Sequence, residues 1–260
     1  MYNFIEIEFL KLKRSKIFLL TLLGAMFPSF LMFLSSKFGE FPETITMETF
    51  LSHVNMYMSL IFVVLLLTII ISYLFGREYN EHTLKTILTA PTTRKMFLLS
   101  KYSMFFIWVL LITIVTTLSA VTFGFMADTT AFNITIMIDS FKEILISNML
   151  LFLTFTPLVF VALKITNLVP SMIGGAILTF TNMIISSSKY AIYFPYSIPY
   201  LIASGEIAEY TTNYTIPYLI IILTFITGLI ISYTYFTRND ITIWKNFRDK
   251  LNIIKLQKQK

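Results

Sequence analysis

Six long stretches of the sequence contain no Asp, Glu, Lys or Arg, and no other feature restricts the fold of this chain as strongly. They cover residues 17–36, 54–76, 102–127, 144–163, 165–188 and 210–237. A helix needs about 20 consecutive apolar residues to cross the hydrocarbon core of a bilayer, and each stretch is long enough. The sequence therefore predicts an all-α integral membrane protein with six transmembrane helices. Pro28 and Pro157 lie within two of these stretches and should kink their helices, and the pair Gly174-Gly175 in the fifth stretch permits close helix approach.

The overall composition favours the same class of protein. Hydrophobic residues make up 56% of the 260-residue chain and charged residues only 13%, whereas about a quarter of the residues in a soluble domain are charged. A water-soluble globule of this size could not bury so much apolar surface. We therefore expect lipid to be the solvent of this protein.

Missing residues exclude several enzyme classes and metal sites. The chain has no Cys, and its two histidines, His53 and His82, do not form an H-x-x-x-H pair. No glycine begins a G-x-x-x-x-G-K motif, so the sequence lacks a phosphate-binding P-loop. We predict no catalytic residue and no metal site in this chain, and we expect another polypeptide to hydrolyse any ATP that is used.

The positions of the basic residues predict the orientation in the membrane. Cytoplasmic segments of membrane proteins are enriched in Lys and Arg. If the N-terminus is cytoplasmic, 17 of the 20 basic residues lie inside, and only Lys37, Lys142 and Lys189 lie outside. We therefore expect both termini in the cytoplasm, with short outer loops at residues 37–53 and 128–143. We attribute the net charge of +6 to topology rather than to nucleic-acid binding.

Two terminal segments flank the six-helix bundle of residues 17–237. We expect the bundle and both segments to form a single domain of residues 1–260. Four apolar residues of segment 1–16 share one helical face: Tyr2, Ile5, Phe9 and Leu12. This pattern predicts an N-terminal interfacial helix, with an ordinary membrane-flanking tail as the alternative. Residues 238–260 carry seven basic residues and predict a basic cytoplasmic tail that forms an amphipathic helix on the inner leaflet.

The segment between the fifth and sixth stretches, residues 188–213, is apolar but cannot span the membrane because Pro195 and Pro199 interrupt it. It is rich in tyrosine, whose ring favours the headgroup level of a bilayer. We predict an outer re-entrant hairpin that packs over the outer ends of the fifth and sixth spans and gates the exit of a pathway; a plain aromatic belt is the alternative. The candidate outer-gate residues are Tyr193, Phe194, Tyr200, Glu206 and Glu209.

The loop between the second and third stretches, residues 76–101, is charged and well patterned. Leu84, Ile87 and Leu88 form one face of a short helix, and Pro91 ends that helix. A short amphipathic helix held between two spans can press on a soluble partner and move those spans. We therefore predict a cytoplasmic coupling helix between spans two and three.

Two groups of residues in the sequence form a recognisable pattern. In the loop they are Glu78, Thr83-Leu84, Ile87-Leu88, Pro91, Thr93-Arg94 and Lys101, and at the N-terminus they are Glu8-x-x-Lys11-x-Lys13-Arg14-Ser15. The loop resembles that of the ABC-2 type exporter permease family, in which glycine usually stands at the position of His82. The N-terminus is similar to those of bacitracin and lantibiotic transport permeases. Six spans, two cytoplasmic termini and a hairpin before the sixth span also match this family.

The resemblance implies a permease subunit of an ATP-binding-cassette exporter in a bacterial plasma membrane. It would pair with a second permease copy or paralogue and with separate ATPase subunits, which would bind ATP and Mg. The residues implied in ATPase coupling are Glu78, Glu81, Thr83, Leu84, Leu88, Arg94 and Lys101. Taken singly, each of these charges has an alternative role as solvated charge at the inner leaflet. The substrate would be an amphipathic peptide antibiotic, a lantibiotic or a lipid-like compound, moved for export or self-protection.

Three other functional classes are alternatives to a permease subunit. An ion-coupled secondary transporter usually places ionisable groups inside the membrane, and the six stretches have none, although Ser, Thr and carbonyl groups could still bind sodium. An intramembrane hydrolase would need paired catalytic groups at membrane depth, which are also missing. A non-transporting membrane immunity protein would have the same sequence features as a permease and stays open as an alternative.

Overall fold

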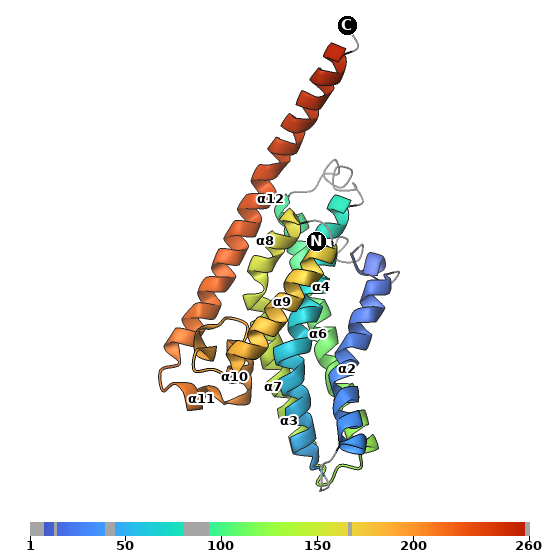
Figure 1. Ribbon diagram of the computed structural model, residues 1–260, viewed down its shortest axis with the longest axis vertical. Coiled ribbons are helices and arrows are strands. Elements are labelled where there is room, and N and C mark those ends of the chain that lie inside the picture. Colours follow the sequence, from blue (N-terminus) through green and yellow to red (C-terminus); the bar gives the residue numbers. More distant parts are fainter. Residues whose placement is uncertain (1–7, 13–14, 40–44, 81–93, 166–167, 258–260) are drawn as a thin grey trace.

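The computed structural model describes residues 8–12, 15–39, 45–80, 94–165 and 168–257, with side chains omitted for 78–80, 94, 168 and 239–257. Within these ranges the chain is helical, and its one β-type contact is an isolated bridge between Thr46 and Thr130. The predicted all-α fold is therefore confirmed for the described residues (Figure 1).

Five helical segments of the described chain are long and apolar enough to cross a membrane. They are Lys16–Phe38, Met47–Arg77, Lys95–Met126, Val169–Ser186 and Thr215–Arg238. The corresponding elements are α2 (Lys16–Phe38), α3 (Met47–Tyr57), the π-helix η1 (Met58–Phe62), α4 (Val63–Asn80), α6 (Arg94–Met126), α9 (Leu168–Ser186) and α12 (Thr215–Gln257). A sixth span is formed if α7 (Ile134–Thr154) and α8 (Thr156–Lys164) are taken together.

The sixth candidate span is bent by 48° between α7 and α8. Phe155 separates the two helices, and Pro157 lies in the first turn of α8, where its missing N–H is not needed. The kink that the sequence predicts at Pro157 is therefore confirmed. Pro28, by contrast, lies inside α2, and that helix is continuous from Lys16 to Phe38.

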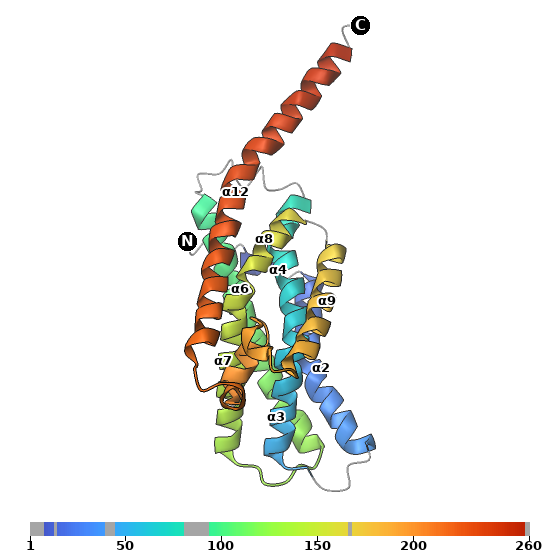
Figure 2. The same cartoon turned by 60° about the vertical axis from the view of Figure 1, so that its left-hand side comes forward.

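The α3–η1–α4 span is the most buried of the candidate spans, whereas α2, α9 and α12 lie at the periphery and expose many apolar side chains. Figures 1 and 2 show α2 and α9 flanking this central span. Exposed apolar side chains on peripheral helices are expected when the surrounding solvent is lipid. The largest fully buried side chain is Trp108 of α6, in the main core cluster.

Polar side chains join the helices inside the bundle. Trp108 Nε1 donates to Thr21 Oγ1 (3.0 Å), and Asn148 Nδ2 donates to Thr113 Oγ1 (2.8 Å). Asn182 Nδ2 of α9 donates to the carbonyl of Leu60 (2.9 Å), which belongs to the π-helical turn. Such interhelical hydrogen bonds hold membrane helices together where no hydrophobic driving force acts between them.

Two glycines allow helices to approach closely. A Cβ atom at Gly175 of α9 would lie 2.7 Å from Thr68 Cγ2 of α4, and one at Gly228 of α12 would lie 2.5 Å from the backbone nitrogen of Pro157. The sequence predicts close approach at the pair Gly174-Gly175. The structure assigns it to Gly175 alone, because a Cβ atom at Gly174 would meet no heavy atom within 4 Å.

The loops at one end of the bundle are shorter than the sequence predicts. Residues 37–53 and 128–143 were expected to be loops, but α3 begins at Met47 and α7 at Ile134. Side chains of Thr46 and Asn133 cap these helices by accepting backbone N–H groups. The expectation was wrong because a charge-free stretch marks only the lipid-embedded part of a helix, and both helices extend beyond it.

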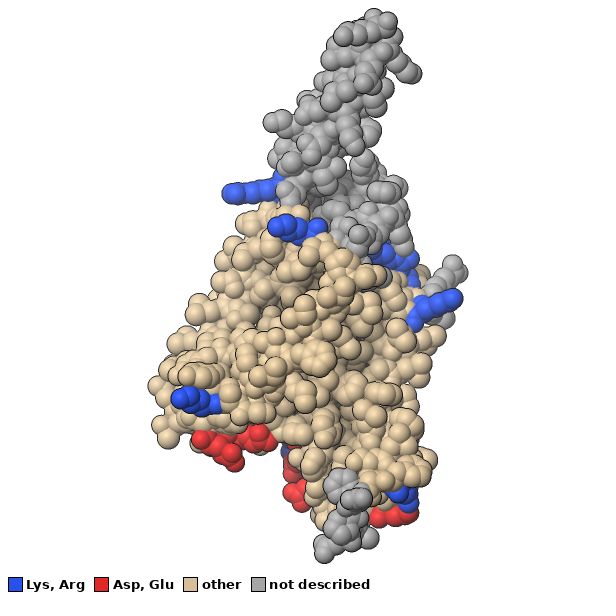
Figure 3. All heavy atoms as spheres, in the orientation of Figure 1, with Lys and Arg blue, Asp and Glu red and all other residues tan. Residues whose placement is uncertain are grey.

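The two ends of the bundle differ in charge (Figure 3). At the basic end, α2 and α6 begin and α4 and α8 end, with Lys16, Arg77, Lys95 and Lys164 nearby. At the acidic end, α3 and α7 begin, and most of the described Asp and Glu residues lie there. The C-terminal residues of α12 continue the same helix away from the bundle at the basic end, with a change of direction visible in Figure 2, rather than forming a separate helix.

Candidate functional site

The predicted coupling loop connects α4 to α6, and these two helices end and begin at the basic end. Glu81, Thr83, Leu84 and Leu88 fall in residues 81–93, outside the described residues. The backbone of Glu78 lies in the last turn of α4, and Arg94 is the first residue of α6. The structure therefore places both ends of the loop on helices that continue into the bundle.

Lys101 is the predicted coupling residue whose side chain the structure describes. It lies two turns into α6 and is only 1% exposed. Its Nζ donates to Glu8 Oε2 (2.9 Å), and Lys11 Nζ donates to Glu8 Oε1 (2.7 Å). Lys101 is thus buried against the N-terminal segment, not presented on the surface.

The carboxylate of Glu8 is the centre of this buried ion cluster, and it is 6% exposed. Burial by itself would raise the pKa of Glu8, but the ammonium groups of Lys101 and Lys11 outweigh it and hold the pKa below its ordinary value. Glu8 therefore stays ionised near neutral pH.

The described part of the N-terminal segment packs on the bundle through two residues. Residues 8–12 are helical, and Glu8 and Leu12 are buried while Phe9 is 50% exposed. Tyr2 and Ile5 of the predicted apolar face lie outside the described residues. The sequence pattern of apolar residues does not point to Glu8, which is buried because the buried ammonium of Lys101 requires a carboxylate partner.

The tyrosine-rich segment (residues 188–213) folds into short helices at the acidic end: η2 (Ala191–Tyr193), α10 (Ile198–Ser204) and α11 (Ile207–Tyr210). The Tyr200 ring is buried, and its hydroxyl donates to Glu206 Oε1 (2.6 Å). Burial, together with the neighbouring Glu206 carboxylate, raises the pKa of Tyr200. This hydrogen bond closes the turn between α10 and α11.

The other predicted gate residues lie in different environments. Tyr193 is 54% exposed, Glu209 is exposed, and the ring of Phe194 contacts Tyr196 at 5.5 Å between centroids. Glu206 is half-buried, and its carboxylate accepts the hydrogen bond of the Tyr200 hydroxyl. The five residues therefore do not form one surface.

The tyrosine-rich segment also packs on other helices than those expected. The sequence predicts contact with the fifth and sixth spans, but α10 packs mainly on α7, and Leu60 of η1 joins its apolar cluster. The ring of Tyr196 meets Phe155, at the break between α7 and α8, with 5.1 Å between centroids. Contact with the sixth span is made through η2.

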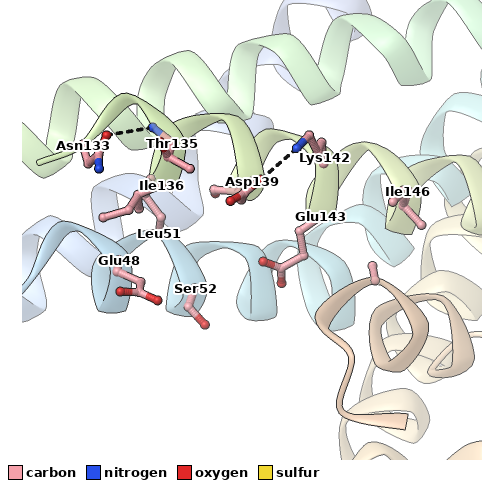
Figure 4. A pocket seen from close by; sticks show the side chains of 12 residues that line it. Glu48, Leu51, Ser52, Asn133, Thr135, Ile136, Asp139, Lys142, Glu143 and Ile146 are labelled. Atoms are coloured by element: carbon pink, nitrogen blue, oxygen red, sulfur yellow. Dashed lines mark hydrogen bonds and ion pairs between the residues drawn. The ribbon is translucent and has the colours of Figure 1, made fainter. Parts of the chain in front are cut away.

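An open cleft of about 520 Å³ lies at the acidic end between α3, α7 and the end of α10 (Figure 4). Its lining includes three carboxylates, those of Glu48, Asp139 and Glu143. Asn55 Nδ2 donates to Glu143 Oε2 (3.1 Å), and Lys142 Nζ donates to Asp139 Oδ1 (2.8 Å). The sequence does not single out these acids, because 37–53 and 128–143 were treated as plain loops; helical spacing of their charges would have been the signal.

These features define a class of protein. Several long apolar helices, with opposite charge at the two ends of their bundle, are typical of a multi-pass membrane protein. Among the described residues, no group of three or more His, Cys, Asp or Glu could hold a metal ion.

Comparison with known proteins places the chain in a family within this class. Residues 4–182 match the family described as ABC-2 family transporter protein, and the chain belongs to that family. It is 33% identical to the bacitracin transport permease protein BCRB of Bacillus licheniformis over 207 residues, which cover 79% of this chain and 98% of the relative. No solved structure matches the chain. The family resemblance that the loop and the N-terminus suggested is thus confirmed.

Proposed function

We propose that this chain is the membrane-spanning permease subunit of an ATP-binding-cassette exporter that moves an amphipathic peptide antibiotic, a lantibiotic or a lipid-like compound. The observation that carries the proposal is the similarity to a bacitracin transport permease along almost the whole length of that relative. The function would be export or self-protection.

The protein would be located in a bacterial plasma membrane, with its basic end in the cytoplasm. The positive-inside rule supports this orientation, since Lys16, Arg77 and Lys164 lie at the basic end. The N-terminal helix would then lie at the inner leaflet, and the tyrosine-rich segment would form a re-entrant hairpin on the outer side.

Energy would come from separate ABC ATPase subunits, because the sequence has no P-loop. ATP and Mg would bind to those subunits, and the loop between α4 and α6 would dock on them. Leu84 and Leu88 would supply apolar contacts, while Glu78 and Arg94 would supply charged ones. A second permease copy or paralogue would complete the transporter.

On the outer side, the proposal assigns substrate release to the tyrosine-rich segment. The buried Tyr200 and the half-buried Phe194 would keep the exit closed. A cationic, amphipathic substrate would be attracted by the exposed Glu209 and by the carboxylates of the neighbouring cleft.

The test is export by the chain with and without its ATPase. Inverted vesicles containing both proteins should accumulate labelled bacitracin when ATP is added, and vesicles with the chain alone should not. Leu84→Asp should abolish accumulation and ATPase co-purification, because docking would bury an unpaired charge. Glu78→Ala and Arg94→Ala should lower export while leaving membrane insertion intact.

The same vesicles distinguish the other classes. Accumulation driven by an ion gradient without ATP would indicate a secondary transporter. Protection of cells against the antibiotic without any accumulation would indicate a non-transporting immunity protein. Either result would contradict the proposed function.

A further inference from the structure

We propose that Glu8 is a positioning residue that fastens the N-terminal helix to the base of α6, so that this helix moves with the coupling loop. The inference rests on the proposed function, since it concerns how movement of the loop reaches the membrane. The inference connects the N-terminal helix to the coupling loop, although Glu8 is 93 residues away from Lys101 in the sequence.

The contact between Glu8 and Lys101 is a buried ion pair. The two side chains are 6% and 1% exposed, and the N–O distance is 2.9 Å. Removing one partner of such a pair leaves the other as an uncompensated buried charge, which strongly disfavours separation of the two segments. The N-terminal helix and α6 therefore behave as one unit.

The Lys101 side chain lies beside a contact between α6 and α12. Its Nζ is 5.4 Å from the centre of the Phe97 ring, on the same helix. That ring stacks on Phe236 of α12, with 5.4 Å between centroids and 9° between planes. Three segments thus meet at the basic end: the N-terminal helix, α6 and α12.

The coupling loop joins this assembly directly, since α6 begins at Arg94, seven residues before Lys101. Seven residues make about two helical turns, which move as a rigid rod. A displacement of the loop would therefore carry Lys101, and through Glu8 the N-terminal helix, with it. Other described ion pairs, such as Asp139 with Lys142, are exposed and contribute little to holding segments together.

The experiment compares charge removal with charge exchange in the complete transporter. Glu8→Gln removes the carboxylate that Lys101 and Lys11 share, and Lys101→Met leaves Glu8 with Lys11 and without its buried partner. The exchange Glu8→Lys with Lys101→Glu keeps one carboxylate between two ammonium groups, because Lys11 remains. Asp128→Asn, which breaks an exposed ion pair with Lys37 outside the acidic cleft, is the control.

We expect Glu8→Gln to co-purify with the ATPase and to retain basal ATP hydrolysis, while bacitracin moved per ATP falls about tenfold in Glu8→Gln and in Lys101→Met. The exchange variant should recover most of that ratio, and Asp128→Asn should leave it unchanged. A residue that only stabilised the fold would lower the amount of protein but not the ratio of transport to hydrolysis.

If the single variants do not fold, the double variant Glu8→Gln with Lys101→Met removes both buried charges, so that neither is left without the other. Full transport per ATP in this variant, or in Glu8→Gln, overturns the inference, as does an exchange variant that folds but does not recover. Leu84→Asp, measured in parallel, separates the two proposals. Normal transport by Leu84→Asp would overturn the proposed docking, whereas its failure beside a fully active Glu8→Gln would overturn only the role of Glu8.

Discussion

At the scale of single residues, Gly228 is the most restricted glycine. Its missing Cβ would lie 2.5 Å from the Pro157 nitrogen and 2.6 Å from the Thr156 carbonyl carbon. These are backbone atoms at the break of a span, and they cannot rotate away as a side chain can. The position therefore tolerates no side chain without separation of α12 from α8.

We predict that Gly228→Ala lowers the free energy of unfolding by about 1–3 kcal/mol, the usual cost of overpacking. Gly174→Ala should be neutral or stabilising, because its Cβ meets open space and alanine favours a helix. Thermal unfolding of both variants in the same detergent gives the measurement. Equal midpoints for the two variants would contradict the close packing of α12 on α8.

A second prediction at this scale concerns the pH dependence of Glu8. Its pKa in the folded protein lies below the ordinary value of 4.5, so its ion pairs stabilise the fold above that pH. This contribution is lost as the pH falls through the lowered pKa. The stability difference between wild type and Glu8→Gln should therefore be constant from pH 7 to about pH 5 and shrink below pH 4.5. A difference that grew on acidification would show that Glu8 is not held as a carboxylate.

At the scale of elements, the tyrosine-rich segment is held to α7 and to the bend between α7 and α8. Tyr200 and Leu201 are buried in its own cluster with Leu60 of η1, and Tyr196 contacts Phe155. A movement at the bend would therefore displace this segment directly. The bent span, rather than the fifth span, is its main support.

We predict that Phe194→Ala with Tyr200→Ala loosens this segment, raises passive leak of a small dye through the membrane and changes export. Tyr193→Ala, at a position that is 54% exposed, should change neither. Dye release from vesicles and export can be measured on the same preparation. If the double variant leaves both unchanged, the segment is an aromatic belt and not a gate.

At the scale of the whole molecule, the opposite charges of the two ends predict the orientation. Glu209 is exposed at the acidic end and Lys95 is exposed at the basic end. Because the chain has no Cys, single cysteines introduced there can be labelled cleanly. Cysteine at Glu209 should react with a membrane-impermeant thiol reagent in intact cells, and cysteine at Lys95 should react only after lysis. The reverse labelling pattern would show that the protein has the opposite orientation in the membrane.

The sequence by itself determined the class of protein, most of the spans and the kink at Pro157. The physical reason is local: lipid excludes charge along about 20 residues of helix, and proline removes a backbone donor wherever it stands. The loop pattern from Glu78 to Lys101 was also local, and it was enough to suggest the family.

The tertiary structure alone decided which residues meet. Nothing in the spacing of Glu8 and Lys101 indicates that they form an ion pair, and the same holds for Tyr200 and its support on α7. The choice between Gly174 and Gly175 depended on where Thr68 of α4 lies. Such contacts follow from the packing of helices that are far apart in the chain. A buried charge or hydroxyl needs a partner for its hydrogen bonds, and packing decides which residue supplies it and where two helices come close.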